Sequence, residues 1–347
     1  MPPEIEPDDA EPGDLPDVPR PRRQTRLIGH RAAERAFAGA IGEGRLHHAW
    51  LIGGPRGIGK ATLAYRVARR LLAVRPSGEG LEVDPADPGA RKVAALSHPN
   101  LLVLRRHRPV GAKAMPTRIG VEAARAALDL FGTTAGNDGW RVCIVDSAED
   151  LNANSANALL KMIEEPPERA LFLIVSHAPG RLLPTIRSRC RMLPLRPLPE
   201  AAVAEAIAGL PAPFRQPEPE RLARALALSE GSVARALAML DPKTLEVVGE
   251  VESLLARPDR RRALKLAERL SGRDAEALFE TALDTAFRFV SAEIDRRRDE
   301  PPARLAALAE VCEKSGRAAR EAAIYNLDRR PVVLSLFGDL AEALQGA

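Results

Sequence analysis

The sequence predicts an α/β protein with a parallel sheet in its N-terminal part, followed by a small helical unit and a larger all-helical unit. Five short, nearly uninterrupted apolar runs lie between residues 25 and 197, as expected of strands buried on both faces of a sheet. Helical patterns separate several of these runs, which favours parallel strands joined by helices. After residue 197 the strand signals fade, Ala, Leu and Arg dominate, and apolar residues recur at helical spacing.

The predicted strands are the apolar runs themselves. They cover residues 50–52, 101–104, 142–145, 171–175 and 192–195. Between the first two runs, residues 72–100 are rich in Pro and Gly, which indicates an irregular excursion.

Changes in composition divide the chain into four predicted parts. Residues 1–24 are rich in Pro and acidic side chains and cannot bury much apolar surface, so we expect a disordered tail. We expect the α/β domain in residues 25–197, a small helical domain in 198–242 and a second helical domain in 243–347. The net charge of +4 hides a strongly acidic tail on a more basic body.

Composition excludes several classes of protein. The longest run without a charged residue, residues 170–180, is too short to cross a bilayer, so no membrane span is expected. The three cysteines lie far apart and predict no disulfide framework, which favours a reducing cytoplasm. Aromatic residues make up only 3% of the chain, which argues against a base-stacking surface for single-stranded nucleic acid.

A phosphate-binding loop follows the first predicted strand. Residues 53–62 read GGPRGIGKAT, and Gly54, Gly57, Gly59 and Lys60 match a P-loop that opens a helix. In a working P-loop the residue after the lysine is Ser or Thr, whose hydroxyl binds Mg²⁺. Here that residue is Ala61, which predicts a degenerate loop.

The third predicted strand ends in Asp146, as in a Walker B element that contacts Mg²⁺. The position after this aspartate, where a general base is expected, is Ser147, which cannot serve as one at neutral pH without an activating partner. Glu149 is close in sequence, but its spacing does not match.

Three further segments resemble clamp loader subunits of bacterial DNA polymerase III. These subunits are of the AAA+ class, and the resemblance is to the delta-prime type. Residues 46–51 read LHHAWL, residues 157–167 read NALLKMIEEPP, and residues 188–190 read SRC. The resemblance covers about residues 25–240. It implies an AAA+ sheet domain, a helical lid domain and a C-terminal collar domain for oligomerisation.

The resemblance assigns the main functional role to Arg189, flanked by Ser188 and Cys190. In the family this arginine reaches into the nucleotide site of a neighbouring subunit as a trans arginine finger. The alternative is an arginine that caps a helix or pairs with an acid on its own surface.

The resemblance also locates secondary site residues. Ser176, at the end of a predicted strand, matches a nucleotide-facing sensor position or is a simple strand-end hydroxyl. The lid arginine of the family is replaced by Ala234. Relatives often carry four cysteines after the P-loop helix, but residues 73–100 contain none, so we expect no zinc.

The expected function is that of an ATPase-deficient stator in a clamp loader. The resemblance implies a ring like a heteropentamer, with gamma/tau-type motor subunits and a delta subunit, that loads a sliding clamp onto primed DNA during replication. No cofactor is required, and weak, vestigial nucleotide binding stays open. The alternatives are an active ATPase motor subunit of the same loader, or an AAA+ adaptor in DNA repair.

Overall fold

The computed structural model describes residues 18–76, 78, 80–106, 116, 118–120, 126–127, 130–131, 139–212, 214, 217–272, 275–325 and 327–345. The chain divides into two units, residues 1–237 and 238–347, and each is described by itself. The predicted lid segment, residues 198–242, lies mostly in the first unit, which ends at residue 237 within the helix Val233–Met239. The four predicted domain boundaries stay predictions.

The five predicted strands form one parallel sheet in the order β2-β3-β4-β1-β5. They are β1 (Ala49–Gly53), β2 (Leu101–Leu104), β3 (Arg141–Asp146), β4 (Ala170–Ser176) and β5 (Arg191–Pro194). In the register, Trp50 of β1 lies opposite Leu173 of β4 and Arg191 of β5. The predicted α/β fold, followed along the chain by helical units, is confirmed. The loops that follow β1 and β3 lie at the carboxyl edge of the sheet.

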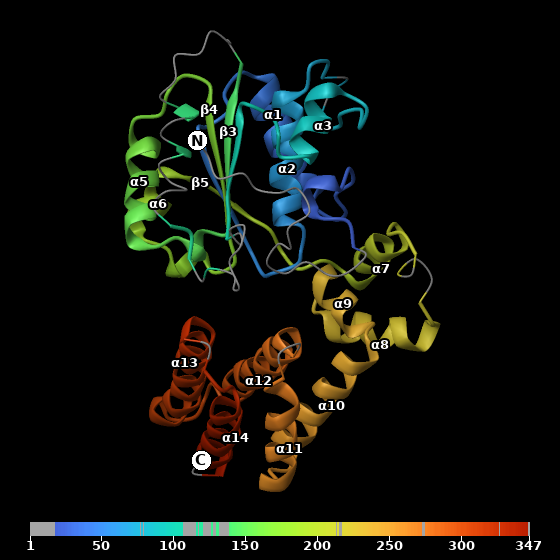
Figure 1. Cartoon of the computed structure of the whole chain (residues 1–347), viewed down its shortest axis with the longest axis vertical. Coiled ribbons are helices and arrows are strands. Elements are labelled where there is room, and N and C mark those ends of the chain that lie inside the picture. The colour runs from blue at the N-terminus through green and yellow to red at the C-terminus, as the bar shows by residue number, and fades with distance from the viewer. Residues whose placement is uncertain are drawn as a thin grey trace. The chain divides into compact units, whose positions relative to one another are not determined.

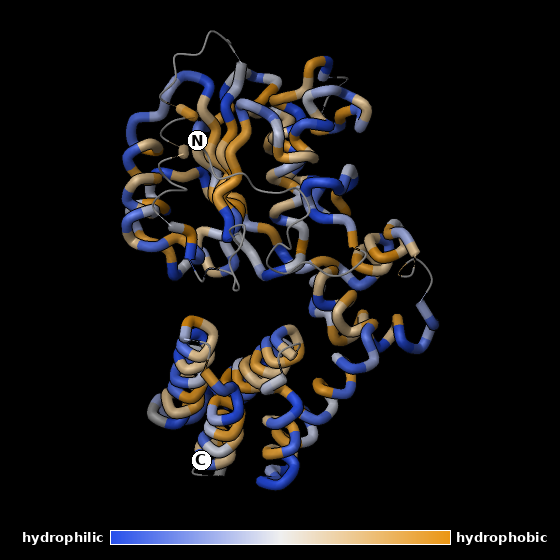
Figure 2. The backbone as a smooth tube through the Cα atoms, in the orientation of Figure 1, coloured by the Kyte–Doolittle hydropathy of each residue, from blue (hydrophilic) through white to orange (hydrophobic). Residues whose placement is uncertain are grey.

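Helices cover both faces of this sheet (Figure 1). The first unit contains α1 (Arg31–Gly42), α2 (Lys60–Leu72), α3 (Pro88–Ala94), α5 (Ala153–Glu164) and α6 (Pro184–Arg189). Alternate residues of β1 enter two different cores: Ile52 packs with α1, α2 and α3, and Leu51 packs with α5 and α6. The strands therefore read as continuous apolar runs, which Figure 2 shows as orange tubes inside the sheet.

The edge strand β5 differs from the prediction of a strand buried on both faces. Its residues are mostly exposed, and Met192 keeps 43% of its surface accessible. Edge position alone does not explain this, because β2 at the other edge of the sheet is largely buried; side-chain exposure depends on which strand faces other elements cover.

The segment before α1 corrects the predicted disordered tail at its C-terminal end. Residues 18–24 are ordered and include a short helix, η1 (Pro21–Arg23); residues 1–17 lie outside the described residues. The side chain of Arg22 is fully buried, and its Nε donates to the Ala94 carbonyl at 3.0 Å. In return Arg69 of α2 donates to the carbonyls of Arg22, at 2.7 Å, and of Gln24. Buried arginines thus bind the backbone of a segment whose composition alone predicted disorder.

The region predicted to be a lid contains α7 (Glu200–Ala208), α8 (Pro219–Ser229) and α9 (Val233–Met239). A sharp turn precedes α9 at Gly231, which has φ +77°. A Cβ at this position would lie 2.5 Å from the backbone of Leu198, so only glycine allows this close approach between the start of α9 and the segment that enters the lid. Leu198 N–H donates to the Gly231 carbonyl at 3.0 Å, which fixes the turn.

The second unit is all-helical. It contains α10 (Pro242–Ala256), α11 (Arg260–Leu270), α12 (Glu276–Arg296), α13 (Pro302–Tyr325) and α14 (Arg330–Gln345). Each of these helices contributes to one core, to which Val251, Leu266, Phe279, Leu308 and Leu336 belong. Among the described residues, no helix combines the length and the apolar character needed to cross a membrane.

Candidate functional site

The P-loop connects β1 to α2 in the conformation that its glycines allow. Gly54 N–H donates to the Ser176 carbonyl of β4 at 3.2 Å, and a Cβ at Gly54 would lie 2.4 Å from the Leu195 carbonyl oxygen. Gly59 has φ +102° and directly precedes α2. The predicted strand–loop–helix context of the motif is therefore present.

The ammonium of Lys60 is folded back onto its own loop. Lys60 is 3% exposed, and its Nζ donates to the carbonyls of Gly54, at 2.5 Å, and of Pro55. Burial lowers the pKa of Lys60 to about 8, although the nearby carboxylates of Asp146 and Glu149 favour the charged form. The cation that serves phosphate in a working P-loop is satisfied here by backbone oxygens.

The Walker B position lies at the end of β3. Asp146 ends the strand and is close enough to Lys60 to influence its charge. Ser147 is buried, and its hydroxyl donates to the Asp150 carboxylate at 3.2 Å. The residue at the expected general-base position thus has its hydroxyl bound to an acid of its own segment.

Glu149 is a site residue whose placement the sequence analysis missed. Its Oε1 accepts from the Ser176 hydroxyl at 2.6 Å and from the N–H groups of His177 and Ala178, each at 2.8 Å. Burial opposes its ionisation, but these hydrogen bonds hold the pKa of Glu149 below its usual value. Glu149 lies in the short helix η2 (Ala148–Asp150), from which its side chain reaches β4. The only sequence signal for this placement was that Glu149 follows Asp146 by three residues.

The sensor candidate Ser176 is therefore committed to this contact. Its side chain is fully buried, and its hydroxyl donates to Glu149, a residue of its own domain. The next residue, His177, is a half-buried part of the cluster. Burial and the positive charges of Lys60 and Arg56 lower its pKa to about 3, so it stays neutral at physiological pH.

The start of α9 contacts the tip of the P-loop within the first unit. The backbone N–H groups of Val233 and Ala234 approach the Gly57 carbonyl at 3.0 and 3.4 Å. A Cβ at Gly57, which has φ +74°, would lie 2.3 Å from the Ser232 hydroxyl and 2.6 Å from the Ala234 methyl. Ala234, where the family arginine is replaced, is therefore packed against the loop itself.

Arg189 projects from the last turn of α6 and keeps much of its surface accessible. Its Nη2 lies 2.9 Å from Glu164 of α5, and the side chains of this pair are 39% and 45% exposed. Its Nη1 also donates to the Thr185 carbonyl at 3.1 Å and contacts the Ser188 hydroxyl at 3.3 Å. The alternative that the sequence left open, pairing with an acid on its own surface, is present in this structure.

The predicted residues fall into two groups. Gly54, Lys60, Asp146 and Ser176 meet at the carboxyl edge of the sheet, whereas Arg189 contacts α5.

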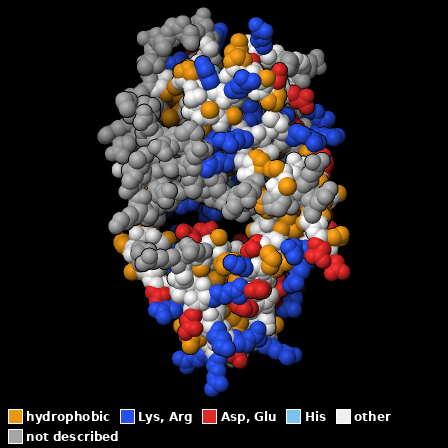
Figure 3. Space-filling model, turned by 45° about the vertical axis from the view of Figure 1, so that its right-hand side comes forward, with side chains coloured by type: hydrophobic (Ala, Val, Ile, Leu, Met, Phe, Trp, Pro, Cys, Tyr) orange, Lys and Arg blue, Asp and Glu red, His pale blue; other side chains and the backbone are white. Residues whose placement is uncertain are grey.

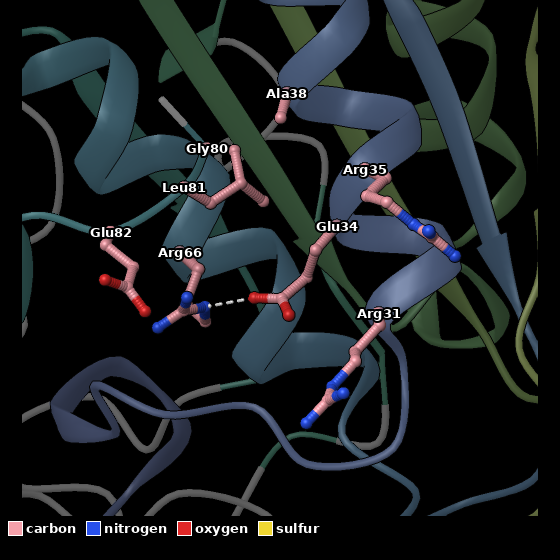
Figure 4. A pocket seen from close by; sticks show the side chains of 8 residues that line it. All are labelled: Arg31, Glu34, Arg35, Ala38, Arg66, Gly80, Leu81 and Glu82. Carbon is pink, nitrogen blue, oxygen red and sulfur yellow. Dashed lines mark hydrogen bonds and ion pairs between the residues drawn. The ribbon is translucent and has the colours of Figure 1, made fainter. Parts of the chain in front are cut away.

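A cavity of about 430 Å³ is lined by neither group. Figure 4 shows Glu34 of α1 facing Arg66 of α2 beside this cavity, with 2.8 Å between their charged groups. The described residues include no group of three or more His, Cys, Asp or Glu placed to hold a metal ion.

Comparison with known proteins identifies the sheet domain. The family model described as "DNA polymerase III, delta subunit" matches residues 29–199. DNA polymerase III subunit delta' of Pseudomonas aeruginosa is 40% identical over 190 residues, which are 53% of this chain and 53% of that protein. The sheet domain is therefore similar to DNA polymerase III delta-prime subunits over about half of the chain.

Other relatives agree with this family. Subunit delta' of Escherichia coli is 36% identical over 196 residues, which are 56% of this chain and 55% of that protein. Subunit tau/gamma of Haemophilus influenzae is 30% identical over 226 residues, 64% of this chain and 31% of that protein. The matched region spans about half the length of the delta-prime relatives. The segment that matches the family model includes the P-loop, Glu149, Ser176 and Arg189.

Proposed function

We propose that this chain is a clamp loader subunit of DNA polymerase III that does not hydrolyse ATP itself and that supplies Arg189 in trans to a neighbouring ATPase subunit. One observation carries the proposal: the residues for turnover are replaced or bound within the chain, while the arginine of the SRC motif stays accessible. The partners are gamma/tau-type motor subunits and a delta subunit in a ring. The ring acts on a sliding clamp and primed DNA.

The P-loop region supports the absence of turnover. Ala61 offers no hydroxyl to Mg²⁺, and Ser147 offers no carboxylate to an attacking water. Lys60 donates to carbonyls of its own loop, and the Gly57 carbonyl accepts from α9. A nucleotide would have to compete with these internal contacts for the same groups.

The local packing of α6 supports the role of Arg189. Ile186 and Cys190 are buried in the core beneath the helix, which fixes its orientation. Ser188 and Arg189 lie between these anchors and are exposed. The ion pair with Glu164 is on the surface, where such pairs contribute about 0–1 kcal/mol, so a phosphate could displace the carboxylate at low cost. A guanidinium then binds phosphate oxygens in a bidentate manner.

The test is reconstitution of the chain with candidate motor and delta subunits, followed by measurement of ATPase activity. Arg189→Ala should leave assembly intact and slow the dependent ATPase site by roughly 10³–10⁵-fold, as expected for loss of a finger in trans. Arg187→Ala, a change at an exposed arginine of the same helix, is the matched control and should leave the rate unchanged. Wild-type ATPase activity in the Arg189→Ala ring would contradict the trans role.

Two further measurements separate the alternatives. Mg-ATP turnover by the purified chain that is abolished by Lys60→Ala would identify an active motor subunit. Failure to form a stable complex with clamp loader motor subunits would favour an AAA+ adaptor in DNA repair. We expect no turnover by the isolated chain and stable co-purification with the motor subunits.

A further inference from the structure

The start of α11 carries a dense row of cations. Arg257, Arg260, Arg261, Arg262 and Lys265 are all exposed, and we call these five residues the basic ridge. The opposite side of α11 is buried in the core of the second unit through Ala263, Leu266, Ala267 and Leu270. This packing fixes the rotation of the helix, so the ridge faces outward. Figure 3 shows Lys and Arg side chains on the surface of the C-terminal unit.

Glu268 is an exposed acid on α11 itself, and three other acidic residues near this helix contact groups outside the ridge side chains. The Asp259 carboxylate accepts from the Arg262 N–H at 2.9 Å and caps the start of the helix. Glu246 and Glu250 of α10 lie 2.8 and 3.2 Å from Arg269, near the other end of α11. Within the described part of the chain, no ion pair involves a cation of the basic ridge.

The ridge does not stabilise its own helix. Arg261 and Lys265 are four residues apart on one face, and like charges at this spacing repel one another. The three arginines also lie in the first turn, where the helix dipole disfavours positive charge. These cations weaken the start of their helix and form no ion pair within the described residues, so an anionic partner would stabilise them.

A second arginine run in the same unit provides the contrast. Arg296 and Arg297, at the end of α12, both contact the carboxylate of Glu293, which is 6% exposed. These arginines neutralise a buried acid, which explains their presence by packing and charge alone. The sequence shows two similar runs, and the structure gives a structural role to this one only.

We propose that the basic ridge binds the phosphate backbone of nucleic acid. Four of its five cations are arginines, whose planar guanidinium groups match phosphate oxygens. The ridge carries no aromatic side chain for stacking, so it reads the backbone rather than the bases. Leu264 is the exposed apolar residue among the cations, whereas a protein partner would normally need several apolar or aromatic anchors at the centre of the contact.

This binding goes beyond the proposed stator function. It needs neither Arg189 nor a nucleotide, because the ridge lies in the second unit. The two proposals can therefore fail separately: ATPase activity of the reconstituted ring tests Arg189, and DNA binding by the full chain alone tests the ridge.

The experiment measures fluorescence anisotropy of a labelled DNA duplex and of a labelled oligothymidine with the full-length chain, from about 50 to 200 mM salt. The triple variant Arg260→Gln, Arg261→Gln, Lys265→Gln removes three ridge cations on the exposed face of α11. The matched control Arg298→Gln, Arg317→Gln, Arg320→Gln removes three exposed cations from the α12–α13 side of the same unit. Thermal melting shows whether both variants remain folded.

We expect the ridge variant to lose at least about tenfold in affinity at low salt, for both DNAs. The slope of log affinity against log salt should fall by about 2–3, close to 0.9 for each lost phosphate contact. Wild-type affinity in the ridge variant, or equal losses in the ridge and control variants, would overturn the proposal. Equal competition by polyglutamate and by DNA of matched charge would indicate an acidic protein surface instead, and would also overturn it.

Discussion

Lys60 and Arg189 are both cations next to strands of the same sheet: Lys60 lies in the P-loop after β1, and Arg189 lies in the SRC motif before β5. Lys60 is buried and donates to carbonyls of its own loop, whereas Arg189 is exposed and held by a surface ion pair. Withdrawing Lys60 would break hydrogen bonds in a buried environment, but moving Arg189 only exchanges one solvated partner for another. The P-loop is thus closed by contacts within the chain, and we call it the closed side; Arg189 is the open side, because it stays accessible.

The closed side of this comparison is tested most strongly at Gly57. Gly57→Ala places a methyl against Ser232 and Ala234 at a positive φ, so we expect the free energy of unfolding to fall by about 2–4 kcal/mol. Gly44→Ala is the matched control, because Gly44 also has a positive φ, +65°, but has open space around it. Urea unfolding followed by fluorescence of Trp50 and Trp140, the two tryptophans of the chain, reports on the first unit.

If Gly57→Ala costs no more than Gly44→Ala, the contact between the P-loop and α9 does not hold the loop in solution. The closed description of the nucleotide site would then be wrong. A larger loss that becomes smaller when Ser232→Gly is added would instead assign part of the cost to this contact.

Acid should weaken the closed side through His177. The folded state holds the pKa of His177 at about 3, below the unfolded value near 6.5, so between these pH values the unfolded chain binds the extra proton. Stability contributed by neutral His177 is therefore present above about pH 6.5 and is lost as pH falls. From pH 7 to pH 5 the loss from this group is about 2 kcal/mol.

The measurement is the difference between wild type and His177→Gln, because other groups also titrate in this range. Urea unfolding at both pH values should show a smaller loss of stability in the variant. Identical pH dependence of the two proteins would mean that His177 is not held neutral by the cluster around Lys60 and Glu149.

A substitution with a small expected effect on stability tests the ion pair that holds Arg189. Glu164→Gln removes the charge that pairs with Arg189, and because the pair is exposed, stability should change by less than about 1 kcal/mol. ATPase activity of the reconstituted ring should stay equal or rise, since Arg189 is freed. Glu165→Gln, at the neighbouring exposed acid, is the control. A loss of ATPase activity specific to Glu164→Gln would show that the pair positions the arginine for its partner.

Much of the fold was predictable, because buried parallel strands leave a simple mark. Cys143 and Phe172 are apolar for the same reason as their neighbours, since both faces of the sheet are covered. The exposure of Met192 was not predictable from the run alone, because it depends on which faces of the strand other elements cover, and the local apolar pattern does not specify this.

The site was predictable where function depends on residue type and less so where it depends on folding. Ala61 and Ser147 lack the required groups in any conformation. The contacts of Glu149 depend on a short helix that returns its side chain to β4, and the contact of Gly57 with α9 joins segments far apart in sequence. Such long-range contacts arise from tertiary packing and leave only weak local signals.

The ordered segment before α1 has a practical consequence for proteolysis. Arg66 and Arg69 of α2 donate to carbonyls of residues 22–25, and Arg22 donates back to Ala94. A protease that trims the acidic terminus should pause before Pro19, since the residues beyond it are bound to the domain. Cleavage past Arg22 would remove a hydrogen-bond acceptor from the buried guanidinium of Arg69. The soluble fragment that survives digestion should therefore begin ahead of the boundary that amino-acid composition marks at residue 25.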